Sequence, residues 1–114
     1  MARVQGEFVG FTYNRVGTTN YTAGQIATLE DIVVVALTPI NASNTQGTLV
    51  TKTNILGEVT VGNAAVAFGD KAFFDPSDGL VYNATASGRV ECGFFIGAYA
   101  ASATDAQIYF DGNI

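Results

Sequence analysis

The chain has 114 residues, the usual size of a single domain, and 48% of them are apolar while only 13% are charged. This composition is typical of a globular protein and excludes a disordered chain. Ten acidic residues against five basic ones give a net charge of −5. We therefore expect neither nucleic acid nor a membrane as a partner, because polyanions and anionic membrane surfaces attract basic proteins.

The near absence of histidine and cysteine limits the catalytic and metal-binding chemistry that the chain can support. Histidine is absent and Cys92 is the single cysteine. Without histidine the chain lacks the usual proton shuttle at neutral pH and the commonest metal ligand. We expect no enzyme activity and assign no catalytic, cofactor-binding or metal-binding residue. A lone cysteine forms no disulfide within the chain, and residues 1–7 lack the apolar segment of a secretion signal, so we expect an intracellular product.

Valine, isoleucine and threonine together supply 32 residues, and such β-branched side chains favour strands over helices. Glycine, asparagine, aspartate and proline recur between the apolar runs, where they indicate turns. The sequence therefore predicts an all-β fold. We expect a small β-barrel or sandwich-like domain of short antiparallel strands with an extended N-terminal arm.

Two interpretations of residues 1–22 stay open, an N-terminal arm or the first strand of the barrel, whereas residues 23–114 are expected to form a β-barrel-like domain. In residues 9–13, large apolar or aromatic side chains alternate with small ones. This pattern predicts a strand with one aromatic face. Residues 14–22 are polar and contain a glycine, which is typical of an arm.

Further strands follow in chain order. Residues 31–37 hold the longest apolar run, which is too short to span a membrane and predicts a strand buried on both faces. The weak alternation in residues 48–53 indicates a strand near an edge. Residues 71–75 and 80–83 flank a Pro-Ser-Asp-Gly turn and predict a hairpin, because proline suits the first corner of such a turn.

The last third of the chain predicts two more strands. Residues 90–99 form a long strand-like run in which Gly93 and Gly97 invite a bulge or the close approach of another backbone. Residues 106–111 alternate and predict a final strand with one buried face. A single helical turn is compatible with residues 63–68 alone.

Several polar or reactive side chains have two interpretations. Asp70, Asp75 and Asp78 lie close together, and carboxylates are ligands that calcium prefers. Their spacing matches no EF-hand loop, however, and aspartate is an ordinary turn residue, so we interpret them as turn residues. Cys92 lies in an apolar run, and we expect it to be a small buried side chain.

Two segments resemble the phage capsid cement proteins, a family of small head-decoration proteins. The first is GDKAFFD (69–75) followed by DGLV (78–81), which is similar to the family's hairpin. The second is CGFFIGAYAASATDAQIYF (92–110), similar to the family's ending of a glycine-bearing strand, a small-residue loop and an alternating strand. Residues 23–37 resemble the family's early glycine and apolar strand, with a longer spacing, and residues 1–22 have no counterpart.

The resemblance implies a β-barrel-like structural virion protein made in the host cytoplasm. Such a protein sits on the capsid exterior of a bacteriophage, often as a homotrimer, and stabilises contacts between major capsid subunits. Its partners would be the major capsid protein and copies of itself, and it would need no cofactor. The alternative is a small β-barrel binding module of a phage tail or host-adhesion structure, in which exposed aromatic rings stack on sugars.

The aromatic residues divide into two groups. Those of the strand-rich part are expected in the core: Phe68, Phe73, Phe74, Phe94, Phe95 and Phe110. Those of the first 22 residues lie in a segment with few charges, and aromatic residues are enriched where one protein docks on another. We therefore predict contacts with the capsid or with a sister subunit at four residues: Phe8, Phe11, Tyr13 and Tyr21.

Overall fold

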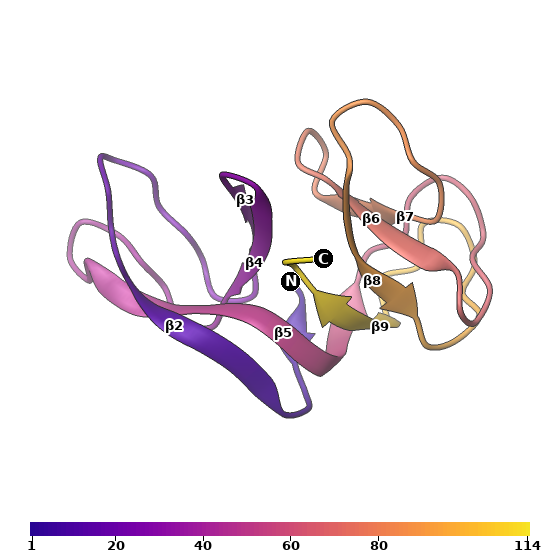
Figure 1. Ribbon diagram of the computed structural model, residues 1–114, viewed down its shortest axis with the longest axis horizontal. Coiled ribbons are helices and arrows are strands. Elements are labelled where there is room, and N and C mark those ends of the chain that lie inside the picture. The colour runs from indigo at the N-terminus through magenta and orange to yellow at the C-terminus, as the bar shows by residue number, and fades with distance from the viewer.

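Nine strands and no helix make up the fold, and the computed structural model describes residues 1–114. The strands form one antiparallel sheet that curls into a half-barrel (Figure 1), which confirms the predicted all-β class. No helix is present that could cross a membrane. The strands are β1 (Arg3–Val4), β2 (Phe8–Asn14), β3 (Ile26–Leu29), β4 (Ile32–Ala36), β5 (Gln46–Val59), β6 (Lys71–Asp75), β7 (Leu80–Tyr82), β8 (Val90–Phe95) and β9 (Ala106–Asp111).

Strand β5 joins the two halves of the sheet. Its first half lies between β2 and β4, and its second half lies between β1 and β9. Strand β3 continues the sheet beyond β4, whereas β8, β6 and β7 continue it in that order beyond β9. Figure 1 shows β2, β3 and β4 at the left and β6, β7 and β8 at the right, with β5 and β9 between them.

The prediction that residues 48–53 lie near an edge is wrong, because they form the middle of the central strand. Among the buried side chains of β5, Val50, Thr53, Leu56 and Val59 recur at every third residue instead of every second. The register against β9 shifts twice along this strand. Such irregularities coil a strand and hide its alternation in the sequence.

Two hydrophobic clusters lie on opposite faces of β4. Val33 and Val35 belong to the larger cluster, and Val34 and Ala36 belong to the smaller one. The predicted burial of this strand on both faces is therefore confirmed. Full burial of one valine side chain contributes about 2 kcal/mol. The smaller cluster consists of Tyr21, Val34, Ala36, Ile40 and Leu49.

The first 22 residues pair with the sheet. Both β1 and β2 are antiparallel neighbours of β5, and Ala2 is buried in the larger cluster. The first-strand interpretation therefore describes β1 and β2, while residues 15–20 form a polar loop at the end of β2.

Most local features of the second half follow the predictions. The hairpin of β6 and β7 is confirmed, with Asp75 opposite Leu80, and β9 alternates between buried and half-buried residues. Residues 63–68, the one segment compatible with a helical turn, form none. Val66 instead exchanges two backbone hydrogen bonds with Tyr99, at 2.9 and 3.1 Å, and a bridge of this kind satisfies its backbone groups without a helix.

The expected phenylalanine core is only partly correct. Phe73 is half-buried, and two members are exposed. Phe94 lies on the face of β8 opposite to Phe95. Phe68 lies in the turn between Val66 and β6, with 71% of its surface exposed. The three that the core contains are Phe74, Phe95 and Phe110.

Two neighbouring residues of β8, Cys92 and Gly93, pack tightly in the sheet. Cys92 is a small buried side chain, as predicted, and burial raises the pKa of its thiol to about 12, so the thiol stays protonated. Gly93 has a φ of 139°, and a Cβ atom there would lie 1.7 Å from the carbonyl oxygen of Tyr109. The predicted close approach of a neighbouring backbone at Gly93 is therefore confirmed.

We expect Gly93→Ala to lower the free energy of unfolding by about 3 kcal/mol or more, because it adds backbone strain and forces β8 away from β9. Gly88→Ala is the matched control, because Gly88 also has a positive φ, 83°, but open space around its Cβ position. It should cost about 1 kcal/mol. Urea denaturation measures both values, and equal losses would show that the contact with Tyr109 is unimportant.

Candidate interaction surface

Strand β2 forms an open edge of the sheet. It pairs with β5 along one edge, and no strand pairs with the other edge (Figure 1). Six of its seven residues are exposed and the seventh is half-buried. Its sequence FVGFTYN has no charged residue and no proline, although natural edge strands commonly use both to prevent pairing with other chains. This edge is therefore available to another strand.

Three of the four predicted contact residues lie on β2. Phe8 and Phe11 are 47% and 37% exposed, while Tyr13 is half-buried. Tyr21 differs, because it is only 7% exposed and belongs to the smaller hydrophobic cluster. It also exchanges backbone hydrogen bonds with Ile40, at 2.8 and 2.9 Å.

The structure brings three of these four rings together. The rings of Phe11 and Tyr13 meet edge to face at 6.5 Å, and those of Tyr13 and Tyr21 do so at 6.1 Å. Burial and the neighbouring Tyr13 raise the pKa of the Tyr21 hydroxyl. Phe8 stands apart, because successive residues of a strand point to opposite faces. Tyr21 therefore anchors the row, and Phe11 is its exposed end.

A second exposed region crosses the sheet on the face that carries Phe11. We name it the outer stripe, and it takes one side chain from each of five strands: Lys71 (β6), Phe94 (β8), Tyr109 (β9), Lys52 (β5) and Val9 (β2). The register places Lys71 opposite Phe94, Phe94 opposite Tyr109, and Val9 opposite Lys52. Lys52 itself lies opposite Asp111, which is two residues from Tyr109 on the same face of β9. Residues directly opposite each other in an antiparallel pair share a face, so these side chains form one row.

Contacts between neighbouring side chains order the outer stripe. The rings of Phe94 and Tyr109 stack at 5.1 Å with an interplanar angle of 8°, and Lys52 Nζ lies 5.9 Å from the centre of the Tyr109 ring. Two grooves of about 220 and 310 Å³ flank the stripe, and Tyr109 lines both. Exposed aromatic rings beside grooves are typical of binding surfaces, because side chains of a partner can fill the grooves and pack against the rings.

Local sequence patterns do not indicate the outer stripe. They place Phe94 in the core, and only the alternation of β9 indicates that Tyr109 points away from Ile108 and Phe110. The membership of Lys52 and Lys71 depends on the order of the strands in the sheet. Local sequence patterns do not contain that order.

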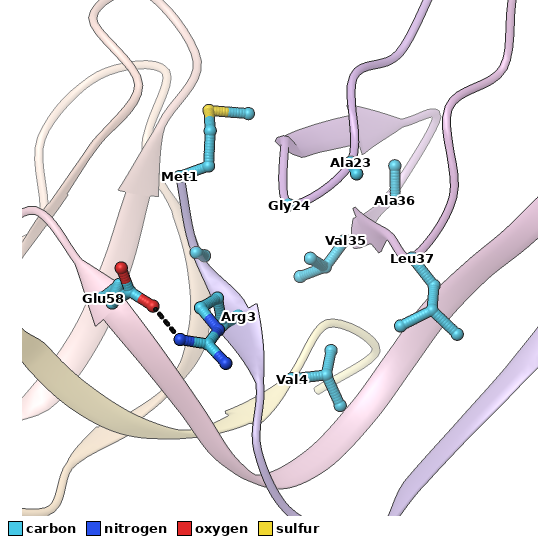
Figure 2. A pocket seen from close by; sticks show the side chains of 10 residues that line it. Met1, Arg3, Val4, Ala23, Gly24, Val35, Ala36, Leu37 and Glu58 are labelled. Carbon is cyan, nitrogen blue, oxygen red and sulfur yellow. Dashed lines mark ion pairs between the residues drawn. The ribbon is translucent and has the colours of Figure 1, made fainter.

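The largest cleft lies between β1, β4 and the turn at Gly24 (Figure 2), with a volume of about 410 Å³. Apolar side chains supply most of its lining. Arg3 and Glu58 form an ion pair of 3.1 Å at its rim, where both side chains are exposed. An exposed pair of this kind contributes at most about 1 kcal/mol. We interpret the cleft as the open mouth of the half-barrel.

The three aspartates considered as calcium ligands accept hydrogen bonds in turns of the chain. Asp70 accepts hydrogen bonds from the N–H of Ala67 at 2.9 Å and from the amide of Asn83 at 3.0 Å. Both bonds lower the pKa of the Asp70 carboxyl, and the bond from Ala67 has the larger effect. Asp78 accepts from the N–H of Leu80 at 2.9 Å. The predicted turn role is confirmed.

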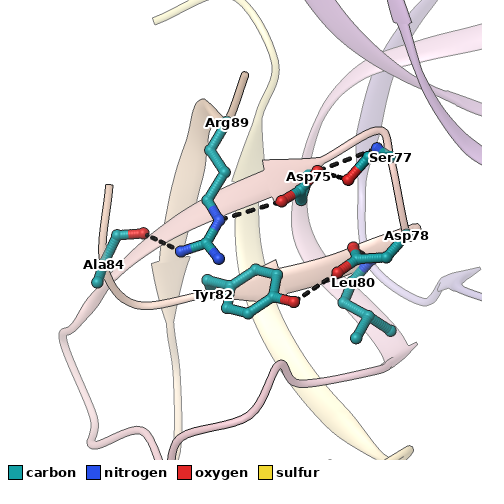
Figure 3. Close-up of polar contacts among 7 residues, drawn as sticks. All are labelled: Asp75, Ser77, Asp78, Leu80, Tyr82, Ala84 and Arg89. Carbon is teal, nitrogen blue, oxygen red and sulfur yellow. Dashed lines mark hydrogen bonds and ion pairs between the residues drawn. The ribbon is translucent and has the colours of Figure 1, made fainter. Parts of the chain in front are cut away.

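Asp75 belongs to a small polar network on the β6–β7 hairpin (Figure 3). It accepts hydrogen bonds from the hydroxyl and N–H of Ser77, at 2.6 and 3.0 Å. It also forms an ion pair of 3.2 Å with Arg89. The Arg89 guanidinium lies 3.5 Å from the centre of the Tyr82 ring, and the Tyr82 hydroxyl donates to Asp78. This last bond raises the pKa of Tyr82. The network fastens the loop before β8 to the hairpin.

Comparison of the chain with family models, curated proteins and solved structures found no match.

Acid should weaken the hairpin network. Hydrogen bonds from Ser77, and then the charge and hydrogen bond of Arg89, hold the pKa of Asp75 below its ordinary value of 3.8. A carboxyl whose pKa is lower in the folded state than in the unfolded state stabilises the fold. This stabilisation is complete above the pKa of the unfolded state and is lost as the pH falls through the pKa of the folded state. We therefore expect the stability advantage of the wild type over Asp75→Asn to be constant above about pH 5 and to shrink below about pH 4.

Urea denaturation between neutral and acid pH measures this difference. Asp105→Asn, in an exposed loop, makes the same change in net charge and is the matched control. If the Asp75→Asn curve ran parallel to that of the wild type at every pH, the hydrogen bonds to Asp75 would not favour its charged form.

Proposed function

We propose that the protein is a phage head-decoration protein of the cement type, which binds the outside of the capsid and stabilises contacts between major capsid subunits. The observation that supports this function best is the outer stripe. It is a row of partly exposed aromatic, aliphatic and basic side chains across five strands of a rigid sheet. Aromatic residues are enriched in protein interfaces, where a few of them supply most of the binding energy.

The positions of the two segments that resemble the cement proteins also support the proposal. Residues 69–81 contain β6 and most of β7, and residues 92–110 contain most of β8 and β9. These four strands are consecutive neighbours in the sheet. They carry Lys71, Phe94 and Tyr109, so more than half of the outer stripe lies on the part of the chain where the resemblance is clearest.

The energetics of a shell suit a small binding surface. Each copy of a 114-residue protein covers a limited area, and a stable interface buries about 800 Å² on each partner. Many copies arranged by the symmetry of the capsid add their contributions. Such a protein stabilises the shell through copy number, and each individual contact can stay modest.

We expect the wild-type protein to co-sediment with heads that lack it and to raise the temperature at which those heads rupture. The double variant Phe94→Ser/Tyr109→Ser should bind at least about tenfold more weakly, because it removes the stacked rings at the centre of the outer stripe. Val16→Ser is the matched control, since it removes an exposed apolar side chain in the loop after β2, outside the stripe. Circular dichroism checks that all variants are folded.

Heads that rupture at the same temperature with and without the wild-type protein, together with no co-sedimentation, would contradict the proposal. The second candidate is a binding module of a phage tail or host-adhesion structure. The stacked pair of Phe94 and Tyr109 beside Lys52 and Lys71 favours it, because sugars bind to aromatic faces flanked by polar groups. Binding to a glycan array without binding to heads would support this second function.

A further inference from the structure

The free edge of β2 carries a regular set of backbone groups that have no partner strand. The N–H of Arg15 donates to Thr45 at 2.7 Å, and the carbonyl of Glu7 accepts from Asn54 at 3.3 Å. Both bonds point toward β5. Because hydrogen bonding alternates along an antiparallel strand, the odd-numbered residues face β5, and the N–H and C=O groups of the even-numbered residues point to the open edge: Phe8, Gly10, Thr12 and Asn14.

This edge is complementary to itself. An antiparallel partner must place its own outward-pointing residues opposite these four. When the partner is a second β2, the register with the longest overlap is centred on Phe11. In that register Phe8 faces Asn14 of the second copy, Gly10 faces its Thr12, and the four pairs exchange about eight backbone hydrogen bonds.

The charges at the ends of β2 match the same register. Glu7 precedes the strand and Arg15 follows it, and neither forms an ion pair within the chain. Arg15 donates only to neutral oxygens, the carbonyl of Thr19 at 3.2 Å and the side chain of Asn20 at 3.0 Å. With Phe11 at the centre, Glu7 of each copy lies opposite Arg15 of the other. Opposite charges at directly opposed positions stabilise a strand pair, and like charges destabilise it.

The side chains on the outer face also fit. Val9, Phe11 and Tyr13 lie on one face of β2, and the register places Val9 of each copy opposite Tyr13 of the other. Phe11 meets its own equivalent in a position without backbone hydrogen bonds, where the side chains approach most closely. Aromatic pairs and pairs of an aromatic with a β-branched residue are favourable across strands. The pairing would cover the sides of these three side chains that face the second copy, while the outer face of the sheet stays open.

We propose that two copies of the protein pair through β2, antiparallel and edge to edge, about a two-fold axis at Phe11. The two half-barrel sheets then continue into one another. A two-fold contact is closed, because the same patch is used by both copies, and it removes the open edge. The homotrimer implied by the family resemblance would need a different contact, in which two unlike patches meet.

Charge reversal tests the register. Glu7→Arg places two arginines opposite each other at both ends of the pair, and Arg15→Glu places two glutamates there. By sedimentation velocity we expect the wild type at about twice its chain mass of 11.9 kDa, and each single variant to dissociate at least about tenfold more readily. An equimolar mixture of the two single variants should form a heterodimer, because every arginine then faces a glutamate.

A second set of measurements covers the case in which Arg15→Glu disturbs the neighbouring loop. Thr12→Pro removes an outward N–H that makes no bond to β5, so the folded monomer should persist while dimerisation is lost. Hydrogen exchange at Thr12 and Asn14 should also slow as protein concentration rises. A monomer at high concentration, a trimer, or single variants that dimerise as tightly as the wild type would overturn the proposal. A monomer that still binds heads would overturn this pairing and leave the proposed function standing.

Discussion

The fold depends on the close junction between β4 and the end of β9 along one side of β5. The N–H of Val33 donates to the carbonyl of Gly112 at 2.8 Å. A Cβ atom at residue 112 would lie 1.7 Å from the carbonyl oxygen of Val33, so the junction requires a glycine. Because β4 and β9 meet there, one strand can serve both halves of the sheet. Because β5 pairs with strands of both halves, it coils and its register shifts.

The coil of β5 gives one face of the sheet two different environments. In the first half, Leu49 lies opposite Phe11 and is buried in the smaller cluster. Three residues later, Lys52 lies opposite Val9 on the outer stripe and is exposed. The same face therefore changes from core to surface within one strand. The aromatic row from Tyr21 to Phe11 spans this boundary, and it connects a buried anchor to residues that another protein can reach.

The sequence predicted those features that depend on local patterns. The run of 31–37, the hairpin turn after Asp75 and the alternation of 106–111 each contain their own structural signal, and each is confirmed. The features that were missed depend on pairing between distant segments. Burial of Tyr21 requires Ile40 across a bridge. Whether Phe94 or Phe95 faces the core depends on the register between β8 and β6, which shifts beside Gly93. The outer stripe requires the order of five strands, and no single segment contains that information.

The proposed pairing through β2 and the proposed binding through the outer stripe are compatible with each other. Val9 is the last member of the stripe and lies on the face where Phe11 would meet its equivalent. A two-fold pair therefore carries two stripes on one side of a continuous sheet, related by the axis at Phe11. A partner that contacts both stripes at once must offer two equivalent sites related in the same way, as capsid subunits on either side of an icosahedral two-fold axis do. Once one stripe is bound, the second binds at a high effective concentration, so two weak contacts suffice where one would not. If the chain is a decoration protein, as we propose, pairing through the β2 edge would determine which symmetry axis of a shell it occupies.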